Sequence, residues 1–261
     1  MKASPQRPNS NARALHPVST AQILEFSDMT RPRSPAELHT WVMAKCEQLS
    51  ATPEAKSFAR SGATLPKKFY EEIYPLSLFS EREFGRDSNV LVEPNLGNDN
   101  FDARIRLGSS ATETVINVEI TYAIDGYDDS LRMEVLQQQG HVSLTGKVYV
   151  SGHRGSCDRE INIDDDAVEH SEIVNGHLLL IEERLRAKAV PRYGKNHILV
   201  VAVDDYLPLR DSSDMEKLST LAQALLPELK LDFGRVVFVG LAGRLFLSYD
   251  VLRVGGPHTV I

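Results

Sequence analysis

Glu119 is the residue of this sequence that most needs a chemical explanation. It falls within residues 114–121, a segment rich in Val, Ile and Thr that predicts a β-strand. Side chains alternate between the two faces of a strand, so Asn117 and Thr121 share the face of Glu119. A carboxylate that is buried there without a partner costs several kcal/mol. Glu119 therefore requires a metal ion, a basic side chain or a place at an exposed end of the strand.

A second carboxylate, Asp102, precedes Glu119 by 17 residues and lies in the predicted strand 101–107. If the two strands pair as a hairpin, Asp102 and Glu119 lie near each other. Two converging carboxylates form an oxygen-ligand site for a divalent cation. The spacing alone leaves a second interpretation open, in which Asp102 caps a turn and Glu119 pairs with an arginine.

The residues around both acids resemble a known nuclease motif. Residues 98–105 (NDNFDARI) and 118–121 (VEIT) resemble the D…(E/D)xK core of the PD-(D/E)XK nuclease-like superfamily. The wider span 66–204 resembles a group of uncharacterised bacterial proteins, through FYEEIYPL at 69–76, DGYDD at 125–129, GHV at 140–142, and Lys188 followed by Tyr193-Gly194. The resemblance implies a restriction-endonuclease-like fold whose core order is helix, three strands, helix, strand. It also implies that Asp102 and Glu119 bind Mg²⁺ or Mn²⁺, and that the protein hydrolyses phosphodiester bonds of nucleic acid.

The sequence departs from the superfamily pattern at Thr121, where the pattern has a lysine. In the mechanism that the resemblance implies, this lysine activates the attacking water and stabilises phosphate charge. Lys188 is the first candidate to replace it, which requires its Nζ to lie within salt-bridge or one-water reach of Glu119, and Arg104 is the second. Glu72 is a candidate third acid for the metal. The alternative to an enzyme is a catalytically inactive nuclease fold that acts as a binding or regulatory protein.

The elements that must position these residues follow from periodicity, caps and breakers. Ser34-Pro35 predicts a helix start, Pro75 a kink in the second helix or a break into two pieces, and Gly85 its end. The predicted helices span 34–49, 66–84, 128–139, 164–189 and 215–226, and the predicted strands span 89–93, 101–107, 114–121, 142–150, 196–203, 235–239 and 244–249. The last two strands should form a hairpin. This order predicts an α/β fold with one mixed central sheet flanked by helices, and an N-terminal helical extension.

Length and composition suit a globular protein. The chain has 261 residues, of which 42% are hydrophobic and 25% charged, and we expect a flexible tail at 1–30 followed by one nuclease-like domain at 31–261. The formal net charge of −7 argues against a protein that coats DNA without specificity, although a short basic stretch at 184–195 could contact nucleic acid locally. The sequence leaves the oligomeric state open.

Two cysteines and no apolar run of membrane-spanning length predict a cytoplasmic protein with no disulfide framework and no membrane partner. The histidines show no zinc-site spacing and are expected in loops or on the surface.

Overall fold

The computed structural model describes residues 23–251, except 86, 109–112, 154–155, 157, 165 and 191. Most of the predicted tail therefore lies outside the described residues. The described part begins inside that tail, and it places Ile23, Leu24 and Met29 in the hydrophobic core.

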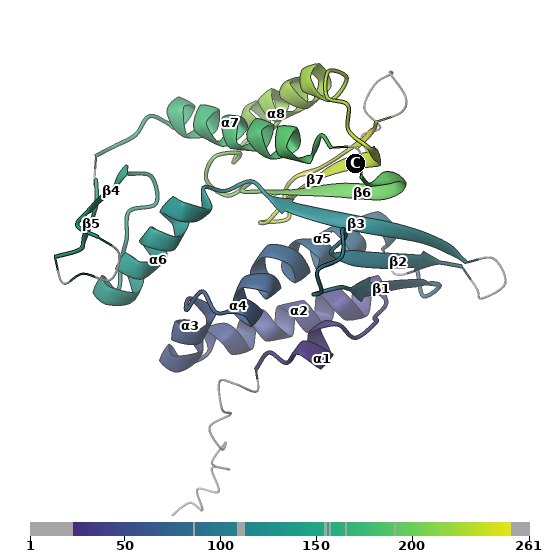
Figure 1. Ribbon diagram of the computed structural model, residues 1–261, viewed down its shortest axis with the longest axis horizontal. Helices are drawn as coiled ribbons and strands as arrows, with labels where there is room; N and C mark the ends of the chain where they lie inside the picture. The colour runs from purple at the N-terminus through teal and green to yellow at the C-terminus, as the bar shows by residue number, and fades with distance from the viewer. Residues whose placement is uncertain are drawn as a thin grey trace, which may run out of the picture.

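Two sheets and two helical layers make up the described chain (Figure 1). The helices are α1 (Phe26–Met29), α2 (Pro35–Ser50), α3 (Pro53–Ala59), α4 (Thr64–Lys68), the π-helical turn η2 (Phe69–Ile73), α5 (Tyr74–Phe84), α6 (Gly126–Gln139), α7 (His170–Lys188) and α8 (Ser212–Leu225). The strands are β1 (Val90–Pro94), β2 (Ala103–Leu107), β3 (Thr114–Tyr122), β4 (Val148–Ser151), β5 (Glu160–Ile163), β6 (Gly194–Val203), β7 (Phe233–Gly240) and β8 (Phe246–Asp250).

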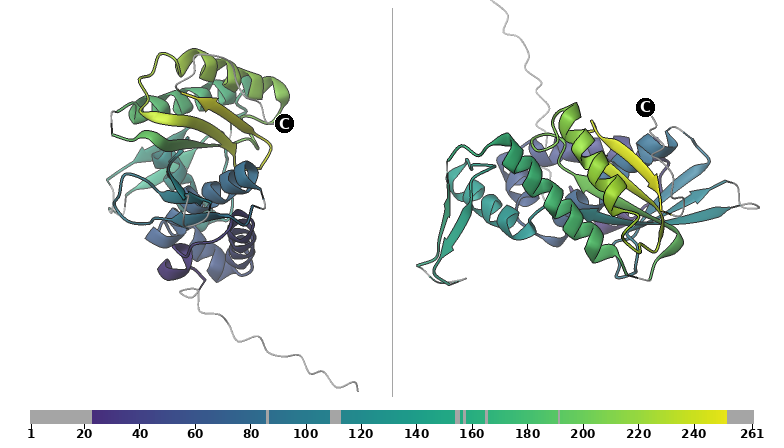
Figure 2. Two further views of the ribbon diagram at one scale, coloured as in Figure 1. Left: turned by 90° about the vertical axis from the view of Figure 1, so that its right-hand side faces the viewer. Right: turned by 90° about the horizontal axis from the view of Figure 1, so that it is seen from above.

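The main sheet has six strands in the order β1-β2-β3-β6-β7-β8. The pairs β3–β6 and β6–β7 are parallel, and the other pairs are antiparallel. Helices α2 and α5 cover one face, whereas α7 and α8 lie side by side across the other (Figures 1 and 2). The prediction of an α/β fold with a mixed central sheet flanked by helices is confirmed.

Successive residues of the central strands face the two cores in turn. Val118 and Ile198 pack with the α2 and α5 side chains, and Leu199 packs with Ile181 and Leu185 of α7. The predicted strand 114–121 is confirmed as β3, which lies between β2 and β6 in the middle of the sheet. The alternation that makes β3 amphipathic therefore also selects the face on which Glu119 lies.

The helix signals at Ser34, Pro75 and Gly85 are confirmed. Ser34 and Glu37 form a reciprocal capping box at the start of α2, and Gly85 ends α5 with a φ of 59°. Proline has no amide hydrogen, so Pro75 cannot donate the ordinary helical bond. The chain widens into η2 directly before it, where the Tyr74 amide donates to the Phe69 carbonyl, five residues back. The predicted kink is thus a π-helical turn.

The excursion between β3 and β6 differs from the prediction. Of the predicted strand 142–150 only the end is found, as β4. Residues 160–163 form the unpredicted strand β5, and α7 begins at His170 instead of residue 164. Strands β4 and β5 form a separate two-stranded ribbon near α6, away from the main sheet (Figure 1). All of their residues are partly buried or exposed, so the apolar signal used to find strands is weak there.

None of the helices in the described ranges combines the length and the apolar character needed to cross a bilayer.

Candidate functional site

The register of the β2–β3 hairpin brings the two predicted acids together. Ala103 pairs with Val118, so Asp102 lies beside Glu119, directly before β2 begins. The Asp102 amide donates to the Val118 carbonyl at 2.7 Å. Its carboxylate Oδ2 accepts a hydrogen bond from the Ile120 amide, also at 2.7 Å. The Asp102 side chain thus supplies a hydrogen-bond acceptor for a backbone amide of β3 at the point where β2 has ended. On its other side, β3 continues to pair with β6 as far as Tyr122.

Glu119 is almost fully buried, with 8% of its surface exposed. Its Oε1 atom accepts a hydrogen bond from Lys188 Nζ, and the two side chains form a salt bridge. Lys188 is the last residue of α7, which crosses over the sheet between β3 and β6. The requirement that Lys188 lie within salt-bridge reach of Glu119 is met. A lysine from α7 therefore supplies the positive charge beside Glu119 that Thr121 lacks.

Tyr193 is the site residue whose role the sequence did not predict. Its hydroxyl donates to Glu119 Oε1 at 3.3 Å and accepts from Arg192 Nη2 at 2.6 Å. The ring stacks on Phe233, with centroids 4.2 Å apart, so its orientation is fixed by packing. The Tyr193-Gly194 segment carried part of the family resemblance, and it was the only sequence signal for this residue.

The other two predicted residues lie less directly at the site. Glu72, on η2, forms a salt bridge with Lys68 at 3.2 Å. Arg104 is exposed, and its guanidinium lies 4.6 Å from the centroid of the Phe101 ring. Lys188 is therefore the lysine that the fold brings to Glu119, and Glu72 contributes its charge from an existing ion pair.

The cluster of acids perturbs its own protonation. Burial raises the pKa of Asp102 to about 7; the hydrogen bond from Ile120 opposes this rise, and the charges of Glu119 and Glu72 add to it. Burial likewise raises the pKa of Glu72, Lys68 lowers it, and the charge of Glu119 raises it further. The three carboxylates are therefore close enough for their charges to interact.

Two carboxylate oxygens remain available for a cation. Within the described part of the chain, Asp102 Oδ1 and Glu119 Oε2 accept no hydrogen bond, and neither belongs to the fully buried unpaired atoms. Hard oxygen ligands of this kind suit Mg²⁺ or Mn²⁺, with water completing the shell. The donor set therefore fits the cation that the motif implies, with two protein ligands.

A different cluster, His170, Asp211 and Asp214, is the one group of three potential metal ligands found within 4.8 Å of one another among the described residues. Its atoms already have protein partners. His170 Nε2 lies 2.7 Å from Asp214 Oδ2, Lys217 pairs with the other oxygen at 3.0 Å, and Asp211 caps the start of α8. This cluster fastens α7 to α8.

Asp102→Asn is expected to flatten the pH dependence of stability between about pH 4 and pH 7. The folded protein keeps the Asp102 proton up to about pH 7, whereas the unfolded chain loses it near pH 4. Folding then takes up a proton in this window, so Asp102 makes stability fall as the pH rises, by up to about 1.4 kcal/mol per pH unit. Asparagine does not titrate, yet it keeps an oxygen for the Ile120 amide.

Urea unfolding of both proteins across this pH range measures the difference. We expect the stability of the wild type relative to the variant to be greatest at the acid end and to decline toward pH 7. Parallel curves would show that the Asp102 carboxyl titrates alike in the folded and unfolded chains.

Comparison with known proteins gives no relative: no family model, no curated protein and no solved structure matches this chain.

Proposed function

We propose that this protein is a Mg²⁺- or Mn²⁺-dependent nuclease with a restriction-endonuclease-like fold, in which Lys188 replaces the missing motif lysine. The observation that carries the proposal is the placement of the Lys188 ammonium on Glu119, beside Asp102. An acid pair with available oxygens and an adjacent lysine are the parts needed to bind a metal and to assist attack on a phosphodiester.

The order of the elements supports the same proposal. Helix α5 is followed by the antiparallel strands β1, β2 and β3, and α7 then leads to β6, parallel to β3. This is the helix, three strands, helix, strand order that the family resemblance implies. The excursion through α6, β4 and β5 is an insertion between β3 and α7.

In the proposed mechanism, Asp102 and Glu119 would hold the cation through their available carboxylate oxygens. When bound, the cation lowers the pKa of a coordinated water and neutralises charge on the phosphate. Lys188 would orient the attacking water or stabilise the developing negative charge, and Tyr193 keeps the Glu119 carboxylate in place by hydrogen bonding to Oε1. Because the Asp102 proton competes with the metal, activity should rise as the pH passes about 7.

The second candidate is a catalytically inactive nuclease fold that binds a partner. The observation that favours it is the direct contact of Lys188 with Glu119, which neutralises the acid in the absence of a metal. The net charge of −7 also disfavours tight binding of nucleic acid.

Cleavage assays on the full chain separate the two candidates. Double-stranded and single-stranded DNA and single-stranded RNA are incubated with Mg²⁺ or Mn²⁺, with EDTA as the metal-free arm. We expect metal-dependent cleavage of at least one substrate, and a loss of about 100-fold or more in Glu119→Gln. Glu134→Gln, which alters an acid paired with Arg159 on the α6 excursion, is the matched control and should cleave as the wild type does.

Thermal unfolding with Mn²⁺ completes the test. If Mn²⁺ stabilises the wild type but not Asp102→Asn, and no substrate is cleaved, the protein is an inactive nuclease fold that binds metal, and the enzyme proposal is rejected. If Mn²⁺ stabilises neither protein and no substrate is cleaved, the two acids serve the structure alone.

A further inference from the structure

Two arginines beside the candidate nuclease site carry no counter-ion. Arg104 and Arg192 are both exposed, and neither makes a salt bridge within the part of the chain that the structure describes. Arg104 follows Asp102 by two residues. Arg192 Nη2 donates to the Tyr193 hydroxyl, and this hydroxyl donates to Glu119. Arginine stays charged at neutral pH, so each acid of the site has a free positive charge close to it.

Aromatic packing holds both guanidinium groups in place. The Arg192 guanidinium lies 4.9 Å from the centroid of the Tyr193 ring, and that of Arg104 lies 4.6 Å from the centroid of the Phe101 ring. The two ring residues are themselves buried, with 6% of the surface of Tyr193 and 8% of that of Phe101 exposed. A cation–π contact at an exposed site contributes about 0.5–1 kcal/mol. Both arginines are therefore preorganised, and less rotamer freedom is lost when a ligand binds them.

The order of the strands puts one arginine on each side of the acids. Arg104 lies on β2 and Arg192 directly before Tyr193 at the start of β6, and both strands are neighbours of β3, which carries Glu119. Asn100 Nδ2 donates to the Arg192 carbonyl at 3.2 Å. This bond fastens the loop before β2 to the segment before β6, so the fold fixes the backbone positions of the two arginines relative to each other.

The sheet surface next to Arg104 is open to solvent. Most residues of β1 and β2 that face α2 and α5 are buried, whereas those on the opposite face are exposed or half-buried: Leu91, Glu93, Arg104 and Arg106. Arg106 is neutralised by Glu93, at 2.9 Å. A long ligand that crosses this face toward the acids therefore meets Arg104 as a free positive charge.

We propose that Arg104 and Arg192 bind two backbone phosphates of one polynucleotide strand, on either side of the phosphate that is cleaved. This inference rests on the proposed nuclease function and adds to it how the substrate is held. The fork of N–H donors of an arginine matches phosphate oxygens. The Phe101 and Tyr193 rings are buried, so they are not free to stack on bases, and phosphate contacts carry no sequence information. The two arginines should therefore hold strands of any base sequence.

Binding of fluorescently labelled oligonucleotides to the full chain in EDTA tests these contacts without cleavage. Single-stranded DNA, double-stranded DNA and single-stranded RNA are each titrated at several salt concentrations, and we expect the wild type to bind at least one of them. Arg104→Gln and Arg192→Gln should each weaken that binding by about tenfold or more, because each removes one charge-assisted contact. Each should also reduce the slope of log affinity against log salt by about 0.7–0.9. Oligonucleotides of two unrelated base sequences should bind alike.

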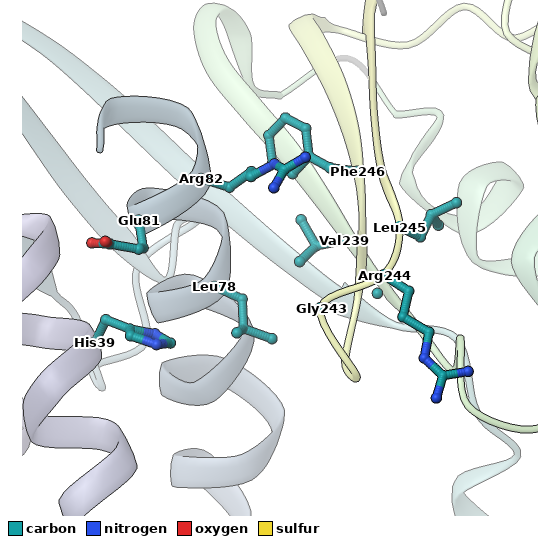
Figure 3. Close-up of a pocket in the computed structure, with 10 residues that line it drawn as sticks. His39, Leu78, Glu81, Arg82, Val239, Gly243, Arg244, Leu245 and Phe246 are labelled. Carbon is teal, nitrogen blue, oxygen red and sulfur yellow. The ribbon is translucent and has the colours of Figure 1, made fainter. Parts of the chain in front are cut away.

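Arg82→Gln is the matched control. Arg82 is also exposed and makes no salt bridge among the described residues, but it lies on α5, which covers the opposite face of the sheet from α7. There it lines a cavity of about 340 Å³ between α2, α5 and the β7–β8 hairpin, and its side chain extends toward Phe246 (Figure 3). The variant loses one positive charge as the other two do, yet it should keep the affinity and the salt dependence of the wild type.

Three results would overturn the proposal: the wild type binds no oligonucleotide, Arg104→Gln and Arg192→Gln bind as Arg82→Gln does, or the affinity depends strongly on base sequence. Cleavage assays of the same variants separate this proposal from the nuclease function. If the wild type cleaves and both arginine variants keep their binding and cleavage, the nuclease function stands and the phosphate contacts are rejected. If binding needs both arginines and no substrate is cleaved, the contacts stand in an inactive nuclease fold.

Discussion

Replacing Lys188 by Met is expected to lower the free energy of unfolding by about 3–5 kcal/mol. The Glu119 side chain is 10% exposed and that of Lys188 20%, so their salt bridge is largely shielded from water. Removing the ammonium leaves a buried carboxylate whose remaining side-chain partner is the Tyr193 hydroxyl. The same substitution should abolish any metal-dependent cleavage, because no other described cation contacts Glu119.

A double-mutant cycle isolates the contribution of this salt bridge. Glu119→Gln combined with Lys188→Met removes both charges, and it should recover most of the lost stability because neither charge is then left buried alone. Arg186→Gln is the matched control: it breaks an exposed pair with Glu182 on the same helix and should cost less than about 1 kcal/mol. Urea unfolding at neutral pH measures the free energy of unfolding of the wild type, of Glu119→Gln and Lys188→Met alone and combined, and of the control. If Lys188→Met costs no more than Arg186→Gln, Glu119 is not paired with Lys188 in the folded protein.

Asp205→Ala is expected to destabilise the protein by about 3 kcal/mol or more. The Asp205 side chain is fully buried and accepts hydrogen bonds from three backbone amides of the β7–β8 turn. Alanine leaves these amides without an acceptor. Asp205→Asn keeps one acceptor oxygen and should fall between the wild type and the alanine variant.

The neighbouring Gly240 offers an independent check of the same contact. A Cβ added there would lie 2.0 Å from Asp205 Oδ2, so Gly240→Ala should displace the carboxylate and destabilise the protein by a similar amount. Asp87→Ala is the control, because Asp87 accepts the exposed Asn89 amide and its loss should cost about 0.5–2 kcal/mol at most. Asp205→Ala and Asp87→Ala with equal unfolding midpoints would mean that the Asp205 carboxylate does not support the turn.

The hairpin register was accessible from sequence because it depends on local features. Alternation of apolar residues located β3, and the neighbouring predicted strand 101–107 was the candidate to pair with it as a hairpin. Pairing of these two strands is enough to bring Asp102 close to Glu119. The ribbon of β4 and β5 was harder, because its residues pack against little and carry a weak apolar pattern, although Ile161 and Ile163 do alternate with polar residues.

The contact between Glu119 and Lys188, in contrast, is not fixed by local sequence features. Lys188 and Glu119 are 69 residues apart, and their contact depends on where α7 ends above the sheet. The sequence offered Lys188 as the first candidate for this contact, but a lysine at the end of a helix is equally compatible with exposure to solvent. Arg104, two residues after Asp102, was the second candidate and instead lies over the Phe101 ring.

By itself, then, the sequence determined the α/β class, the central strand and the pair of acids, since periodicity and turns act over a few residues. The tertiary structure alone decided which cation reaches Glu119, that Tyr193 holds the same oxygen, and that Glu72 already pairs with Lys68. It also created the cavity between α2, α5 and the β7–β8 hairpin from segments about 200 residues apart. These features depend on how helices pack across a sheet, which fixes distances between residues that no local pattern connects.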